Sequence, residues 1–134
     1  MGNEVNQRVS STKMEKEKSL KKSNFFLEIG GGYGGFTEIV KKMCPNIKII
    51  YMDIPPQLYV AEQYLKSIFY KKVAGFKETK EMEFITQDSF LDYDILIVPP
   101  WDIKKIQNDL IDNFYNANSF QEMQKNTVRN YCKQ

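Results

Sequence analysis

The feature that most constrains the fold of this chain is a glycine run, Gly30-Gly31-Gly32-Tyr33-Gly34-Gly35, set between two apolar segments. The segment before it, Phe25 to Ile29, is interrupted only by Glu28, as expected for a strand buried on both faces. The segment after it, Ile47 to Met52, is also strand-like and ends at Asp53. Between the glycines and this second strand, apolar residues recur at helical spacing: Phe36, Ile39, Val40, Met43 and Cys44. The order predicts a βαβ unit that binds a ligand at the carboxyl end of its first strand.

The glycines allow more than one interpretation. Glycine lets the backbone approach a ligand closely and adopt positive φ without steric cost. Gly30, Gly32 and Gly35 satisfy the dinucleotide pattern G-x-G-x-x-G, and Asp53 lies near the spacing of about 20 residues expected for an acid that binds ribose. A third interpretation is a glycine turn with no ligand at all.

Glu28 favours a different ligand. It makes the pattern E-x-G-G-G-x-G-G, which is typical of S-adenosylmethionine (SAM) methyltransferases. A pyrophosphate binds a helix N-terminus and is repelled by nearby negative charge, whereas SAM carries an ammonium and a sulfonium. We therefore favour SAM, with these cofactor-binding candidates: Glu28, Gly30, Gly31, Gly32, Tyr33, Gly34 and Asp53.

A longer match supports this choice. The segments LEIGGGYGGFTEIVKKMCPNIKIIYMDIPPQLYVAEQYLKSIF (Leu27 to Phe69), IVPPWDI (Ile97 to Ile103) and SFQEM (Ser119 to Met123) resemble the sugar O-methyltransferase family of bacterial surface-polysaccharide loci. The most specific part is MDIPPQLYVAEQYL. The resemblance implies a SAM-dependent α/β fold of the Rossmann-like type, with helices on both faces of the sheet, and methyl transfer to a sugar hydroxyl.

Strand counting predicts a partial domain. The methyltransferase sheet has seven strands, and only four are recognised here before Gln134. We therefore expect a polar, disordered tail over residues 1–23 and a SAM-binding domain over 24–134, cut short after its fourth strand. That strand would be an open edge suited to self-association. A non-catalytic SAM-binding module and an NAD-binding Rossmann half are the alternative hypotheses.

The middle of the chain adds further cofactor candidates. After Asp53, a second amphipathic helix is predicted from Pro56 to about Tyr70. Gln57 is most simply a surface residue of this helix, and the alternative interpretation places Ile54 and Gln57 beside the adenosine. Residues 71–92 carry no clear pattern. Asp94 to Val98 predicts a third strand, stopped by two prolines.

Trp101 and Asp102 follow these prolines. Amino-methylating enzymes place a polar residue before Pro-Pro-aromatic to bind the target nitrogen, but Val98 stands there and cannot accept a hydrogen bond, so we reject that activity. We interpret Trp101 as a flat wall near the adenine, or equally as a core residue. Asp102 would accept a hydrogen bond from the adenine amine.

The end of the chain holds the first candidate base. Asp112 to Ala117 predicts a weak fourth strand, in which Asn113 replaces an apolar residue and makes burial doubtful. Phe120 to Lys133 predicts a closing helix with Ser119 as N-cap and Glu122 at N3. A sugar hydroxyl needs a base, and the chain has no histidine, so Glu122 is the first candidate and Asp102 the second.

Composition limits the remaining classes of function. A net charge of +2 gives no argument for nucleic-acid binding. The two cysteines predict no disulfide framework and fit the cytoplasm, with Cys44 expected as a small buried side chain. We expect no secretory signal, no segment of transmembrane length and no metal site. The expected acceptor is a small molecule or glycan.

Overall fold

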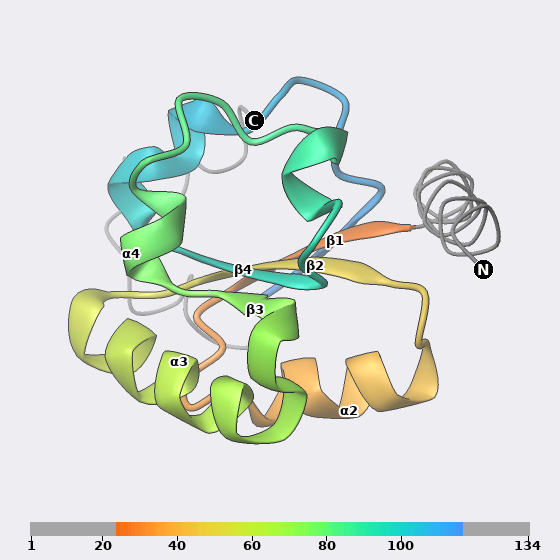
Figure 1. Ribbon diagram of the computed structural model, residues 1–134, viewed down its shortest axis with the longest axis vertical. Coiled ribbons are helices and arrows are strands. Elements are labelled where there is room, and N and C mark those ends of the chain that lie inside the picture. Colours follow the sequence, from red (N-terminus) through yellow and green to blue (C-terminus); the bar gives the residue numbers. More distant parts are fainter. Residues whose placement is uncertain (1–23, 117–134) are drawn as a thin grey trace, which may run out of the picture.

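The computed structural model describes residues 24–116. They form one five-stranded, fully parallel sheet in the order β3-β4-β2-β1-β5 (Figure 1). The elements, in chain order, are β1 Phe25–Ile29, α2 Gly35–Met43, β2 Lys48–Met52, α3 Pro55–Phe69, η1 Tyr70–Lys72, β3 Val73–Ala74, α4 Phe76–Thr79, η2 Gln87–Phe90, β4 Ile95–Val98, η3 Pro100–Lys105 and β5 Asn113–Tyr115. The predicted βαβ unit, β1-α2-β2, is therefore present.

Both faces of the sheet are covered, as the Rossmann-like prediction required. The face that carries Ile49, Tyr51 and Ile97 packs against Leu58 and Leu65 of α3. On the opposite face, alternate strand residues pack against apolar side chains of the later connections, which include Phe90 and Ile103. Figure 1 shows α2 and α3 together on one side of the sheet, with α4 and the later 3-10 turns η2 and η3 on the other. Continuous apolar strands in a parallel sheet are explained by this double burial.

The prediction of the second helix is confirmed. Pro55 and Pro56 occupy the first turn of α3, where a missing N–H is tolerated. Leu58, Ala61 and Leu65 form its buried face. None of the helices within residues 24–116 combines the length and the apolar character needed to cross a bilayer.

The count of four strands was wrong. A fifth strand, β3, consists of only Val73 and Ala74 and pairs with the outer side of β4. It lies in the stretch that carried no clear pattern, because two residues are too few to display a period of two. The only α-helix in this stretch is α4, which has four residues.

The apolar stripe of α2 does not face the core, contrary to the prediction for Cys44 at its end. The buried residues of α2 are Gly35, Thr37 and Lys41, and Val40 is partly buried. Phe36, Ile39 and Met43 are exposed, and Cys44 is exposed as well. Thr37 instead contacts Glu28, and Lys41 contacts Asp94, so polar side chains form the buried side of this helix.

The predicted fourth strand is β5, which pairs with β1 and forms one edge of the sheet, as expected. Its Asn113 and Phe114 are exposed, which agrees with the doubt raised by Asn113. Polar side chains attach β5 to β1: Asp112 Oδ2 accepts from the Phe25 N–H at 2.8 Å, and Asn116 Nδ2 donates to the Ile29 carbonyl at 3.1 Å. The predicted N-terminal tail and the predicted closing helix, with Ser119 and Glu122, lie outside the described residues.

Candidate functional site

The glycine loop joins β1 to α2 at the carboxyl edge of the sheet. Gly30, Gly32 and Gly34 have φ values of 74°, 62° and 97°, a region that only glycine adopts freely. The Gly30 N–H donates to the Met52 carbonyl at 2.8 Å, which ties the start of the loop to the end of β2. The predicted need for positive φ in this run is confirmed.

Asp53 lies against the loop, as its position at the end of β2 predicts. Its Oδ2 accepts from the Gly32 N–H at 3.0 Å, across 21 residues of sequence, and its Oδ1 accepts from the Ile54 N–H at 2.7 Å. A carboxylate offers about four acceptor positions, so Asp53 retains acceptor capacity toward a ligand. The side chain is only partly buried. The structure therefore brings the glycine loop and the second acid together.

Glu28 occupies a more enclosed place than Asp53. It is 2% exposed and lies beneath the loop: a methyl group on Gly31 would come within 2.6 Å of its Oε1. Thr37 Oγ1, from the first turn of α2, donates a hydrogen bond to Glu28 Oε2. Burial raises the pKa of Glu28, the Thr37 hydrogen bond opposes the rise, and the charge of Asp53 adds to it. Its contact with a cationic ligand stays a prediction.

The pKa of Glu28 leads to a pH-dependent prediction. A raised carboxyl pKa contributes stability that is present below the unfolded value of 4.5 and is lost as the pH rises through the folded pKa. Glu28→Gln removes the buried charge and keeps an oxygen that can accept from Thr37. We expect its melting temperature at pH 7.5 to exceed that of the wild type, and the difference to shrink toward pH 4.5. Circular dichroism melts at both pH values measure this.

The control for this prediction is Glu83→Gln, which changes an exposed carboxylate of the same chain. It should leave the melting temperature nearly unchanged at both pH values. A Glu28→Gln variant less stable than the wild type at pH 7.5 would show that the buried carboxylate stabilises the fold, which is the opposite of the expected effect.

Tyr51 was missed by the sequence reasoning. Its ring is fully buried under the loop, its hydroxyl donates to the Gly32 carbonyl, and that hydroxyl lies 3.4 Å from Asp53 Oδ2. Burial, then the charges of Asp53 and Glu28, raise the pKa of Tyr51 far above its usual value. The sequence did offer a signal, because Tyr51 places a hydroxyl in an otherwise apolar strand, two residues before Asp53. Thr37 was missed for a similar reason, as a polar residue on the buried side of α2.

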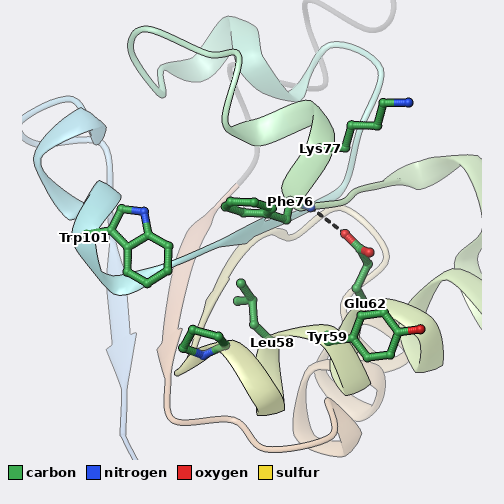
Figure 2. A pocket seen from close by; sticks show the side chains of 7 residues that line it. Leu58, Tyr59, Glu62, Phe76, Lys77 and Trp101 are labelled. Atoms are coloured by element: carbon green, nitrogen blue, oxygen red, sulfur yellow. Dashed lines mark hydrogen bonds between the residues drawn. The ribbon is translucent and has the colours of Figure 1, made fainter.

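An apolar hollow of about 290 Å³ opens just after Asp53 in the chain (Figure 2). Its lining combines the start of α3, the start of α4 and the residue after the Pro99-Pro100 pair: Pro55, Leu58, Tyr59, Glu62, Phe76, Lys77 and Trp101. Figure 2 shows Trp101 and Phe76 on one side of the hollow and Leu58 on another. The rings of Phe76 and Trp101 meet edge to face, with centroids 6.5 Å apart. Glu62 accepts a hydrogen bond from the Phe76 N–H.

The remaining predicted residues are exposed, paired within the chain, or outside the described residues. Trp101 is 61% exposed, so its alternative interpretation as a core residue is wrong. Ile54, Gln57 and Tyr33 are also exposed, and the Tyr33 ring packs against Tyr64 with centroids 5.1 Å apart. Asp102 lies beside the hollow in sequence, but its carboxylate pairs with Lys105 Nζ at 3.4 Å. Glu122 is outside the described residues. Within residues 24–116, no three His, Cys, Asp or Glu side chains gather as metal ligands.

Comparison with known proteins supports an assignment at the level of family. Searches against curated proteins and against solved structures gave no significant match. A family model described as an O-methyltransferase domain matches residues 2–92, more than half of the chain, including the glycine loop, Asp53 and most of the hollow's lining. With a parallel α/β sheet and an acid beside a glycine loop, this chain belongs to the O-methyltransferase domain family.

Proposed function

We propose that this O-methyltransferase domain binds SAM across the carboxyl ends of β1, β2 and β4 and transfers its methyl group to a sugar hydroxyl. The observation that carries the cofactor assignment is the contact between Gly32 and Asp53 beside an apolar hollow. The choice of a sugar acceptor rests on the resemblance of residues 27–69, 97–103 and 119–123 to sugar O-methyltransferases.

Three features of the described residues support the proposed cofactor. Asp53 retains acceptor positions for ribose hydroxyls. The hollow beside Trp101, Pro55 and Leu58 offers apolar and aromatic walls for a flat base. A methyl group placed on Gly32 would meet no heavy atom within 4 Å, so the space beside this part of the loop is open for the amino-acid end.

The reaction places different demands on the chain. SAM, when bound, supplies an electrophilic methyl carbon, so the protein must orient an acceptor hydroxyl and exclude water. A base must also take the hydroxyl proton. Among the described residues, Asp102 is the candidate, although its carboxylate must then exchange its contact with Lys105 for one with the acceptor. Glu122 stays the first candidate because it follows the predicted fourth strand in the sequence.

Asp53→Ala tests the cofactor assignment. Loss of the charge-assisted hydrogen bonds to ribose should weaken SAM binding by roughly 1.5–3 kcal/mol, which is about a 10- to 150-fold rise in Kd. Titration calorimetry with SAM and with S-adenosylhomocysteine measures this. Asp53→Asn keeps an acceptor for the Gly32 N–H and isolates the role of the charge. Glu83→Ala, at an exposed site, is the matched control.

Three outcomes separate the hypotheses. Unchanged SAM affinity in a folded Asp53→Ala protein would overturn the assignment of Asp53. Tighter binding of NAD than of SAM by the wild type would favour a dinucleotide site instead. SAM binding without methyl transfer to any sugar or nucleotide sugar would favour the non-catalytic module and would overturn the proposed activity.

A further inference from the structure

The Tyr51 hydroxyl is a buried polar group to which the proposed function assigns no role. Tyr51 is 0% exposed, and its ring lies under the glycine loop, where a methyl group on Gly31 would come within 2.5 Å of Cε2. Phenylalanine would fill the same space without an O–H group that has to be satisfied, and a buried tyrosine usually finds a partner for that group. The contacts of the hydroxyl therefore indicate what it does.

Two acceptors meet at this hydroxyl. It donates to the Gly32 carbonyl, and Asp53 Oδ2 lies 3.4 Å from it. Burial, together with the charges of Asp53 and Glu28, holds the pKa of Tyr51 far above its usual value, so the hydroxyl keeps its proton and stays a donor at neutral pH. Without that proton, the Gly32 carbonyl and the Asp53 carboxylate would be two acceptors facing each other with no donor between them. The hydroxyl therefore allows these two groups to lie close together.

Three successive residues at the end of β2 hold the glycine loop. The Met52 carbonyl accepts from the Gly30 N–H at 2.8 Å. Asp53 Oδ2 accepts from the Gly32 N–H at 3.0 Å, and Tyr51 donates to the Gly32 carbonyl, so Gly32 is held at both of its polar groups. The side of Gly32 on which a Cβ would stand is open, since a methyl group there meets no heavy atom within 4 Å. Tyr51 therefore acts from beneath the loop and leaves the space for a ligand free.

We propose that the Tyr51 hydroxyl is a positioning group for the cofactor: by fixing Gly32, it sets the direction in which Asp53 presents its remaining lone pairs to the ribose. This inference rests on the proposed binding of SAM at this edge of the sheet. Asp53 Oδ1 is fixed separately by the Ile54 N–H at 2.7 Å, so both carboxylate oxygens are held before a ligand arrives. A preorganised acceptor spares the ligand the cost of ordering it, and the saving appears as tighter binding.

Tyr51→Phe tests this role, because it removes the hydroxyl and keeps the buried ring. In the full-length chain, its Kd for S-adenosylhomocysteine by titration calorimetry should rise about 3- to 10-fold, as expected for the loss of one hydrogen bond. Tyr93→Phe is the matched control: Tyr93 packs against the other core cluster, and its variant should bind like the wild type. Circular dichroism melts show that each variant is folded. Unchanged affinity in a folded Tyr51→Phe protein would overturn the inference.

Coupling to Asp53 separates a positioning role from a merely structural one. If the hydroxyl acts through Asp53, adding Tyr51→Phe to Asp53→Ala should raise the Kd no further than Asp53→Ala does alone. Additive losses would show that the hydroxyl supports the site as a whole, which would overturn this inference and leave the cofactor assignment intact. A wild type that binds no S-adenosylhomocysteine would instead overturn the proposed function, and this inference with it.

Hydrogen exchange followed by NMR measures the positioning without any ligand. In Tyr51→Phe, the Gly32 N–H, which donates to Asp53, should exchange several-fold faster than in the wild type. The Gly30 N–H, which donates to the Met52 carbonyl, should keep its rate. Equal acceleration at both glycines would show a general loosening of the loop, and no acceleration at Gly32 would show that its contact with Asp53 forms without the hydroxyl. Either result would contradict the proposed role of Tyr51.

Discussion

Replacing Asp94 with alanine is expected to lower the free energy of unfolding by about 3 kcal/mol. Asp94 lies at the start of β4 and holds two lysines: Lys48 Nζ at 2.6 Å and Lys41 Nζ at 3.2 Å. Lys41 is 6% exposed, so the variant would leave a buried ammonium without its carboxylate. Removing one partner of a buried pair costs about 3–5 kcal/mol, and the partial exposure of Asp94 places it at the lower end. Chemical denaturation measures the loss.

Two further measurements sharpen this prediction. Lys42→Ala removes an exposed lysine from α2, the helix that carries Lys41, and should have only a small effect on the free energy of unfolding. Burial alone would raise the pKa of Asp94, but the hydrogen bond from Lys48 and the charge of Lys41 outweigh it and lower the pKa. The contribution of Asp94 is therefore present above its unfolded pKa of 3.8 and lost as the pH falls through the folded value. The gap between variant and wild type should narrow below pH 3.8, and equal stability at neutral pH would contradict the buried ion pair.

The elements that the sequence predicts correctly are those whose signal is local. β1, β2 and β4 are apolar runs stopped by glycine, acid or proline, and α3 combines a proline start with a three- and four-residue period. Most of the residues that these patterns mark as apolar are buried, and Phe26 and Phe69 are partly buried. Their assignment needed no knowledge of their neighbours.

The orientation of α2 could not be predicted because distant polar partners decide it. Its apolar stripe is as regular as that of α3, yet Thr37 reaches Glu28 and Lys41 reaches Asp94 on the opposite side of the unit. Lys41 also donates to the Ile47 carbonyl at 3.0 Å. These contacts join residues up to 53 positions apart, and hydrophobic periodicity carries no information about them.

In the candidate site, too, some features follow from the local sequence and others depend on distant contacts. Gly32 and Asp53 were both cofactor-binding candidates, and they lie together because the carboxyl ends of adjacent parallel strands meet at one edge. The depth of Glu28 could not be anticipated, since it depends on Gly31 closing over the strand and on Thr37 and Tyr51 lying beside it. The role of Tyr51 depends on the same loop conformation. The sequence therefore predicted that Asp53 lies beside the glycine loop, but not the layer of side chains beneath that loop.

That layer makes Gly31→Ala the second change with a large expected effect. Gly31 has no positive φ to preserve, but an added methyl group would lie 2.5 Å from Tyr51 Cε2 and 2.6 Å from Glu28 Oε1. Both side chains are buried and have no open space to rotate into, so the methyl group can be accommodated only if the loop or the packing around Tyr51 shifts. Overpacking of this kind costs about 1–3 kcal/mol, and the closeness of both contacts places it near the upper end. Denaturant unfolding would measure it.

Gly75→Ala provides the contrast, because it creates an equally close contact with a different kind of neighbour. Its methyl group would meet Glu62 Oε1 at 1.9 Å and Lys66 Nζ at 2.7 Å, the ends of flexible, partly exposed side chains. These can rotate aside, so we expect a loss well below that of Gly31→Ala. If the Gly31 loop also positions Asp53 for SAM, Gly31→Ala should weaken SAM binding along with stability. Equal losses of stability in the two variants would show that the buried side chains under the loop rearrange as easily as the partly exposed side chains of α3.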